Sequence, residues 1–218
     1  MVDVLSCLAS GLRADAVNPA GQIILGLAVT GVSLSYWLPA VMSFDRQLFL
    51  AINRVLQQSP WIKIFRALWP VGRSEFLMIV VLGLVIYNFT LGISAGVAFL
   101  MWGLIDRVIK RGVNRTRPFN ELAGINMLQP KRPKDPSFPS GDTFHIWFLL
   151  SIILQTLAVP LPLIVLLFVI AVMVSLGRIA MGVHYPTDVL AGAGIGLAAA
   201  GLCLLLNSYI SIIFLHNG

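Results

Sequence analysis

Long apolar runs, separated by shorter polar segments, make up most of the 218-residue chain. A transmembrane helix needs about 20 consecutive apolar residues, and the run 22–42 has that length. The nearly unbroken apolar run from Phe76 to Ile105 is too long for one span, and the polar break at 88–90 predicts two short ones. The pattern therefore predicts an all-α membrane protein with six transmembrane helices in one bundle. The expected spans are 22–42, 76–89, 92–106, 143–159, 161–176 and 187–213.

The segment 45–73, which follows the first expected span, mixes apolar and basic positions. Trp61 and Trp69 stand in it, and tryptophan is enriched at membrane–water interfaces. We therefore expect an interfacial helical segment here. Leucines at helical spacing also predict a short helix over 3–15 that lies on the membrane surface.

Composition supports the membrane assignment. The chain is 58% hydrophobic and 11% charged, with a mean hydropathy of +0.89, whereas soluble domains are about a quarter charged. Its length suits a single domain over 1–218. A net charge of +6 would suggest nucleic acid as the partner of a soluble protein. Because the basic residues lie beside apolar spans, we expect the membrane, and no nucleic acid, as the partner. Cys7 and Cys203 form neither a disulfide framework nor a metal site.

The basic residues gather at one face of the predicted bundle. Six spans put both termini on one side and the connections 42–75, 106–141 and 177–186 on the other. Every Lys and Arg except Arg13 falls in or beside those connections. The positive-inside rule would make this face cytoplasmic.

Three polar pieces in these connections carry the candidate chemistry. They are Lys110-Arg111-Gly112-Val113-Asn114-Arg115-Thr116-Arg117-Pro118, then Phe138-Pro139-Ser140-Gly141-Asp142, then Arg178, His184 and Asp188 separated by five and three residues. A phosphoryl group in transfer spreads negative charge over three oxygens, and catalysis consists largely of cancelling that charge with fixed donors. Arginine supplies a planar fork of donors and lysine a point charge. The pieces therefore indicate a site for a phosphate group.

The second and third pieces add a capping hydroxyl and a candidate nucleophile. Ser140 can donate its hydroxyl, and Gly141 lets a ligand approach the free amides at the start of a helix, which bind anions. His184 and Asp188 are one helical turn apart and can share a face. A carboxylate bonded to one ring nitrogen fixes the tautomer and leaves the other nitrogen free to attack phosphorus.

These pieces resemble the signature of the type 2 phosphatidic acid phosphatase superfamily. That signature is Lys, six residues, Arg-Pro; then Pro-Ser-Gly-His; then Ser-Arg, five residues, His, three residues, Asp. Gly177 stands here in place of the family serine. The resemblance implies a membrane lipid phosphatase that needs no metal or other cofactor and acts on a lipid phosphate in the bilayer. It makes His184 the nucleophile and Asp188 its orienting group. The phosphate-binding residues it implies are Lys110, Arg117, Ser140, Gly141 and Arg178.

Asp142 departs from the family pattern, because it replaces the histidine that protonates the leaving group. An ordinary aspartate carboxyl, with a pKa near 3.9 against about 6.5 for histidine, is ionised at neutral pH. Burial would favour the protonated acid, whereas positive neighbours and a helix start favour the carboxylate. The alternative is that the leaving group needs no acid. A phosphate leaving a diphosphate is far less basic than an alkoxide, which predicts a preference for diphosphate lipids. His145, one helical turn further on, is a less favoured substitute.

Other interpretations of the same residues stay open. A lipid phosphotransferase that moves phosphate from undecaprenyl diphosphate to lipid A also looks similar around Asp142, so transfer to an acceptor competes with hydrolysis. A non-catalytic phospholipid-binding protein is the third hypothesis. Basic clusters beside spans often only anchor anionic head groups. That role is expected for Arg111, Arg115, Lys131, Arg132 and Lys134.

The orientation of the site is a separate expectation. In bacterial members of the family the active face is usually periplasmic, in conflict with the charge rule. Because the basic residues are needed for the substrate, their distribution is biased by function. We therefore expect an inner-membrane protein whose active site lies on the periplasmic face.

Overall fold

The computed structural model describes residues 18–217, and side chains up to residue 213. The expected surface helix at 3–15 lies outside these residues. The described part of the chain is helical and contains no strand, as the sequence predicts. Its elements are α2 (Pro19–Leu34), η1 (Ser35–Trp37), α3 (Pro39–Gln57), α4 (Trp61–Leu68), η2 (Trp69–Gly72), α5 (Ser74–Tyr87), α6 (Phe89–Val113), α7 (Pro118–Glu121), α8 (Gly141–Thr156), α9 (Leu161–Ala180) and α10 (Pro186–Asn217).

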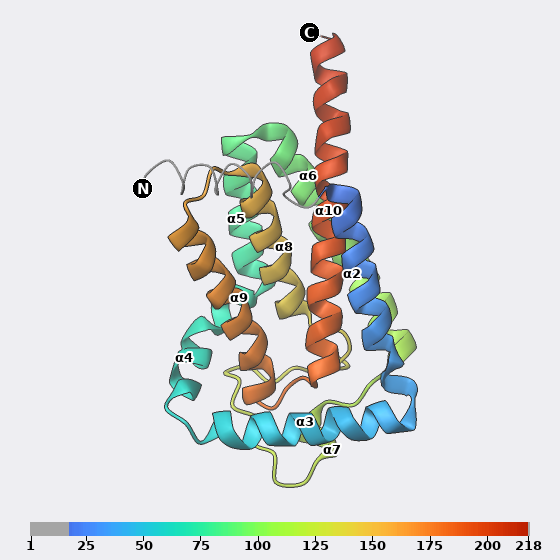
Figure 1. Ribbon diagram of the computed structural model, residues 1–218, viewed down its shortest axis with the longest axis vertical. Coiled ribbons are helices and arrows are strands. Elements are labelled where there is room, and N and C mark those ends of the chain that lie inside the picture. The colour runs from blue at the N-terminus through green and yellow to red at the C-terminus, as the bar shows by residue number, and fades with distance from the viewer. Residues whose placement is uncertain (1–17, 218) are drawn as a thin grey trace, which may run out of the picture.

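The long helices form an upright bundle, and α3 lies across one of its ends (Figure 1). The last helix, α10, packs against α2, α8 and α6. Its contact with α2 is made by glycines: a Cβ atom added at Gly26 would lie 2.4 Å from the carbonyl oxygen of Gly194. This close approach follows the use of small residues where membrane helices meet.

Within residues 18–217, four helical segments are long and apolar enough to cross a membrane. They are Pro19–Trp37, Phe89–Glu121, Leu161–Ala180 and Pro186–Ile213. A fifth is possible if Trp61–Gly72 and Ser74–Tyr87, which meet at 49°, count as one bent span. The predicted number of six is therefore not confirmed. One reason is that α8 has 16 residues, or about 24 Å at 1.5 Å per residue, which is short of the usual 30 Å.

The first predicted span, 22–42, has the wrong boundary. Helix α2 ends at Leu34, and the chain turns through η1 before α3 begins at Pro39. Leu38 is extended, with ψ at 129°, as expected for a residue before proline. The turn at Asn88 is where the sequence places it, and the Asn88 side chain accepts a hydrogen bond from the Leu91 amide at 3.0 Å.

Two further helices continue past their predicted ends. Helix α6 runs on from 106 to Val113, and Asp106 and Lys110 form an i,i+4 ion pair of 3.1 Å on it. Helix α9 extends four residues beyond 176 and so carries Arg178 in its last turn. Lys110 and Arg178 therefore project from helix ends rather than from flexible connections.

Helix α3 occupies the place predicted for the interfacial segment, and one of its faces is polar and buried. Asp45, Phe49 and Asn53 recur at i+4 spacing on that face and are all buried. The Asn53 amide donates to the carbonyl oxygens of Ile179 and Ala180 at 2.9 and 3.0 Å. These carbonyls end α9 and have no partner within the helix. Helix α3 thus fixes the end of α9 next to the loop that carries His184.

Candidate active site

The three sequence pieces meet at the end of the bundle that faces α3 (Figure 1). Three contacts join them. The Arg117 guanidinium lies 3.1 Å from the His184 ring, the Ser140 amide donates to the Asp188 carbonyl at 3.0 Å, and Arg178 pairs with Asp142. The predicted residues therefore form one cluster.

His184 lies in the loop between α9 and α10 and is 5% exposed. Its Nε2 atom faces Arg117 Nη1, and Nδ1 faces Asp188 Oδ2 at 3.6 Å. The second distance is too long for a hydrogen bond, and Nδ1 has no other partner. Burial, followed by the charge of Arg117, lowers the pKa of His184 to about 4. The ring is therefore neutral at pH 7, and because a guanidinium can only donate, Nε2 is the unprotonated nitrogen that can act as the nucleophile.

Asp188 is held from three sides at the start of α10. Its Oδ2 accepts from the Tyr185 amide at 2.8 Å, and its Oδ1 accepts from Arg115 Nη1 at 2.7 Å. Its carbonyl receives the Ser140 amide described above. The carboxylate is fully buried, so its position beside the His184 ring is fixed by these partners.

Arg115 is not a head-group anchor, and that prediction is wrong. Its side chain is 8% exposed and bridges two buried carboxylates, Asp188 and Asp45, with a 2.6 Å contact to the latter. The rings of Tyr36 and Tyr185 lie 4.4 and 4.1 Å from its guanidinium carbon. A guanidinium in this setting is paired and stacked, and it supports Asp188 from behind.

Asp45 is a functional neighbour that the sequence reasoning missed. It accepts hydrogen bonds from the amide and hydroxyl of Thr187, at 3.0 and 2.7 Å, as well as from Arg115. The available signal was a lone acidic residue in register with Phe49 and Asn53 on one face of an amphipathic helix.

The first piece supplies two cations that share a partner. Asp135 accepts from Lys110 Nζ at 2.6 Å and from Arg117 Nη2 at 3.0 Å. Its carbonyl also accepts from Arg117 Nε at 2.8 Å. Although burial is the largest single influence and raises the pKa of Asp135, the charges of Lys110 and Arg117 outweigh it and lower that pKa to about 2. The Asp135 carboxylate therefore occupies a position in which a phosphate oxygen could accept hydrogen bonds from Lys110 and Arg117.

Arg178 is fully buried and has one guanidinium nitrogen, Nη2, without a hydrogen-bond partner. Its Nη1 pairs with Asp142 and lies 3.4 Å from Gln129 Oε1. Buried donors are nearly always paired, so a free one at the end of α9 is a donor available to an anion. Arg178 is also close enough to Arg117 for the two charges to interact.

Ser140 and Gly141 begin α8 beside these cations. The Ser140 hydroxyl lies 2.9 Å from that of Thr143, and a Cβ added at Gly141 would meet nothing within 4 Å. Nothing therefore blocks the side of Gly141 where a Cβ would stand, at the start of a helix whose first amides can bind an anion. His145 points elsewhere: its Nδ1 lies 2.8 Å from the Gly72 carbonyl, and its ring packs near Phe99 and Phe144.

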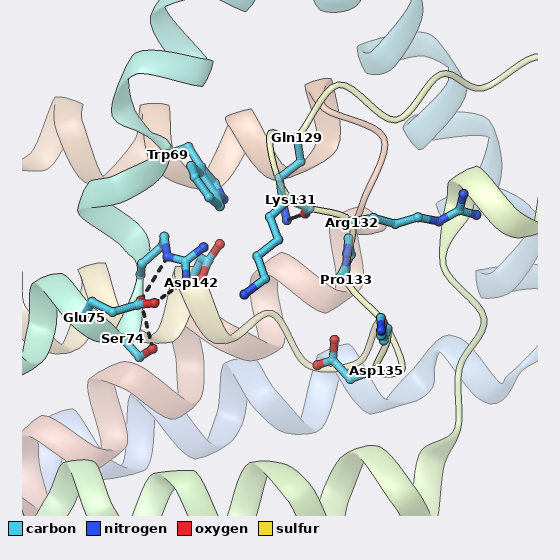
Figure 2. Close-up of a pocket in the computed structure, with 11 residues that line it drawn as sticks. Trp69, Ser74, Glu75, Gln129, Lys131, Arg132, Pro133, Asp135 and Asp142 are labelled. Carbon is cyan, nitrogen blue, oxygen red and sulfur yellow. Dashed lines mark hydrogen bonds and ion pairs between the residues drawn. The ribbon is translucent and has the colours of Figure 1, made fainter.

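A cavity of about 390 Å³ adjoins the cluster (Figure 2). It is lined by Trp69, Arg73, Ser74, Glu75, Gln129, Lys131, Arg132, Pro133, Lys134, Asp135 and Asp142. Asp135 and Asp142 belong both to its wall and to the ion pairs of Lys110, Arg117 and Arg178. The cavity therefore adjoins the cation cluster, formed by Lys110, Arg117 and Arg178, and the two carboxylates lie between them.

Known proteins share both the sequence and the fold. Residues 76–211 match the PAP2 superfamily. Phosphatidylglycerophosphatase B of Bacillus subtilis is 30% identical over 173 residues, which cover 72% of this chain and 80% of that protein. The undecaprenyl-diphosphatase of Sulfolobus acidocaldarius is 35% identical over 108 residues, which cover 47% and 48% of the two chains.

Two crystal structures have the same architecture. A transmembrane PAP2-type phosphatidylglycerolphosphate phosphatase from Bacillus subtilis aligns with a TM-score of 0.65 and 25% identity, over 90% of this chain and 97% of that one. LpxE of Aquifex aeolicus aligns with a TM-score of 0.63 and 27% identity, over 73% and 93%. The match spans more than half of the chain and the fold agrees, so this protein belongs to the PAP2 superfamily of membrane phosphatases.

Proposed function

We propose that the enzyme hydrolyses the terminal phosphate of lipid diphosphates through a phosphohistidine on His184. The observation that carries the proposal is the buried neutral imidazole whose Nε2 lies 3.1 Å from Arg117, at the edge of the cation cluster. A nucleophile and donors for the phosphoryl oxygens are thereby adjacent, as covalent phosphoryl transfer requires.

In the first step, His184 Nε2 attacks the terminal phosphorus. The bond to the bridging oxygen breaks, and its electron pair stays on that oxygen in the leaving lipid phosphate. Lys110, Arg117 and Arg178 offset the charge on the phosphoryl oxygens, together with Ser140 and the open amides at Gly141. Asp188, which faces Nδ1, orients the ring and stabilises the positive charge that the imidazole gains.

Asp142 suits the second step better than the first. Its Oδ2 accepts from the Arg178 guanidinium, so it is engaged as an acceptor rather than placed to donate to a leaving group. It can instead accept a proton from water as the water oxygen attacks phosphorus and the P–N bond breaks to release inorganic phosphate. A leaving phosphate needs no acid, because its pKa is about 6, whereas an alkoxide does. This asymmetry supports a preference for diphosphates over monoesters.

The comparisons support this substrate class in part. One relative is an undecaprenyl-diphosphatase, whereas another is a phosphatidylglycerophosphatase, which acts on a monoester. We place the active site on the outer face of the membrane, as expected from the family, where a polyprenyl diphosphate could be converted to its monophosphate.

The test is phosphate release by the purified enzyme in detergent, on undecaprenyl diphosphate and on phosphatidylglycerophosphate. The diphosphate should have the higher kcat/KM. Release of inorganic phosphate without an acceptor lipid would separate hydrolysis from phosphotransfer. Equal or faster turnover of the monoester would refute the diphosphate preference.

The phosphohistidine intermediate is tested by trapping it with substrate labelled in the terminal phosphate and then measuring the acid sensitivity of the labelled protein. Labelled protein should be stable in alkali and labile in acid. His184→Ala should lose both the label and the turnover while it still binds substrate. His145→Gln, at a buried histidine whose Nδ1 faces the Gly72 carbonyl, is the matched control. Labelling that persists in His184→Ala would refute the proposal.

A further inference from the structure

The cavity beside the cation cluster contains basic side chains that the proposed chemistry does not use. Four of its lining residues are basic, but two of them have partners. Arg73 pairs with Glu75 and stacks on Trp69 at 4.5 Å. Arg132 donates to Asn120 at 2.9 Å and lies over the Phe119 ring. Within residues 18–213, Lys131 and Lys134 form no ion pair.

Of the two unpaired lysines, Lys131 reaches into the cavity. Figure 2 shows its side chain extending between Asp142 and Asp135, whereas that of Arg132 points away. The two carboxylates that flank it already pair with other cations, Asp142 with Arg178 and Asp135 with Lys110 and Arg117. The Lys131 ammonium therefore contributes an uncompensated positive charge to a cavity that adjoins the cluster.

The backbone around Lys131 is tied to the cation cluster. Gln129 Nε2 donates to the Lys131 carbonyl at 2.7 Å, and Gln129 Oε1 lies 3.4 Å from Arg178 Nη1. The Leu128 amide donates to the Met181 carbonyl at 3.1 Å, in the turn that precedes His184. These bonds set the distance between the lysine and the residues that would hold the terminal phosphate.

We infer that this cavity receives the second anionic group of the head group, and that Lys131 neutralises the phosphate that leaves. The inference rests on the proposed function. When Nε2 of His184 bonds to the terminal phosphorus, the electron pair of the broken bond remains on the bridging oxygen of the lipid phosphate. Lys131 donates a hydrogen bond to that phosphate and keeps its proton. The structure thus compensates for the missing acid at 142 with a fixed charge, which only a substrate with a second anionic group can use.

The cavity is also of a suitable size and chemistry for such a group. Its volume of about 390 Å³ falls within the range of small-molecule sites, which are about 300–1,000 Å³. Trp69 and the hydroxyl of Ser74 complete its wall. A head group with one phosphate would fill the cation cluster alone and leave the cavity unused.

The experiment compares Lys131→Ala with Lys63→Ala, at an exposed lysine of α4 that does not line the cavity. Inhibition by methylenediphosphonate and by inorganic phosphate is measured for each. Lys131→Ala should weaken methylenediphosphonate about tenfold, the loss expected for one charge-assisted hydrogen bond, and should weaken inorganic phosphate far less. Lys131→Arg should restore most of the difference, and Lys63→Ala should match the unmodified enzyme.

Turnover provides a second readout. The ratio of kcat/KM on undecaprenyl diphosphate to that on phosphatidic acid, whose head group has a single phosphate, should fall about tenfold in Lys131→Ala. Equal losses for both inhibitors, or an unchanged substrate ratio, would overturn the inference. The inhibition assay needs no phosphohistidine, so the two proposals can fail separately. Lys131→Ala can leave inhibition by methylenediphosphonate unchanged while His184→Ala still abolishes turnover, and the reverse result is equally distinguishable.

Discussion

The buried arginine behind Asp188 gives the sharpest prediction about stability. Arg115→Met keeps the length and apolar contacts of the side chain but leaves Asp45 and Asp188 without their cation. Both carboxylates are at most 1% exposed, and breaking a buried ion pair by removing one partner costs about 3–5 kcal/mol. A chain of this size loses about 2–4 °C of Tm per kcal/mol, so the expected fall is roughly 6–20 °C.

The assay is thermal unfolding of the purified protein in detergent, together with kcat on a diphosphate lipid. Arg111→Met is the matched control, because Arg111 lies in the same sequence piece and is exposed. The double variant Arg115→Met, Asp45→Asn should recover part of the lost stability, since it removes one of the two unpaired charges. If Arg115→Met cost no more than Arg111→Met, the buried bridge would have no energetic importance and the reasoning would be wrong.

Three further predictions test the site and the packing. His184 should titrate near pH 4 in histidine NMR spectra assigned with His184→Asn, and its pKa should rise in Arg117→Leu. Because this folded pKa is depressed below 6.5, the contribution of His184 to stability should be lost as pH falls from about 6.5 towards 4. Titration of His184 near 6.5 would contradict the prediction. Asp135→Asn should tighten inhibition by inorganic phosphate up to about fivefold, since a half-exposed ion pair is worth at most about 1 kcal/mol; weaker inhibition would mean that Asp135 mainly positions Arg117. Gly26→Ala should lower Tm, because overpacking costs about 1–3 kcal/mol of stability. Gly31→Ala should leave Tm unchanged, since a Cβ at this position meets nothing within 4 Å. Equal Tm values for the two variants would refute the close contact of α2 and α10.

The sequence predicts the helical class and the three pieces of the site because both depend on local spacing. Apolar runs identify helices, and the intervals between Lys110 and Arg117 and from Arg178 to Asp188 identify a family. The end of α2 was missed because mean hydropathy is high on both sides of Pro39, although the proline itself was a usable signal. A count of spans is harder still, since α8 is apolar and buried but short.

The missed residues are those whose partners are distant in the chain. Asp45 meets Thr187 and Arg115 only because α3 folds across the bundle end. The ion pairs of Asp135 depend on the path of the loop before α8, which contains no periodic pattern. Arg115 was grouped with exposed neighbours because charge alone does not distinguish a bridging arginine from an anchoring one.

The amide of Asn53 has a consequence for how freely this protein can vary. Helix α3 looks replaceable, since many amphipathic sequences could rest on a lipid surface. Yet its upper face terminates α9 and holds the carboxylate that supports Arg115. A library of substitutions along α3 should therefore tolerate changes at Phe44 and Val55, which are exposed. It should not tolerate changes at 45, 49 and 53, which follow one another at one-turn intervals on the buried face. Replacement of α3 by an unrelated surface helix would keep the contact with the membrane but abolish enzyme activity.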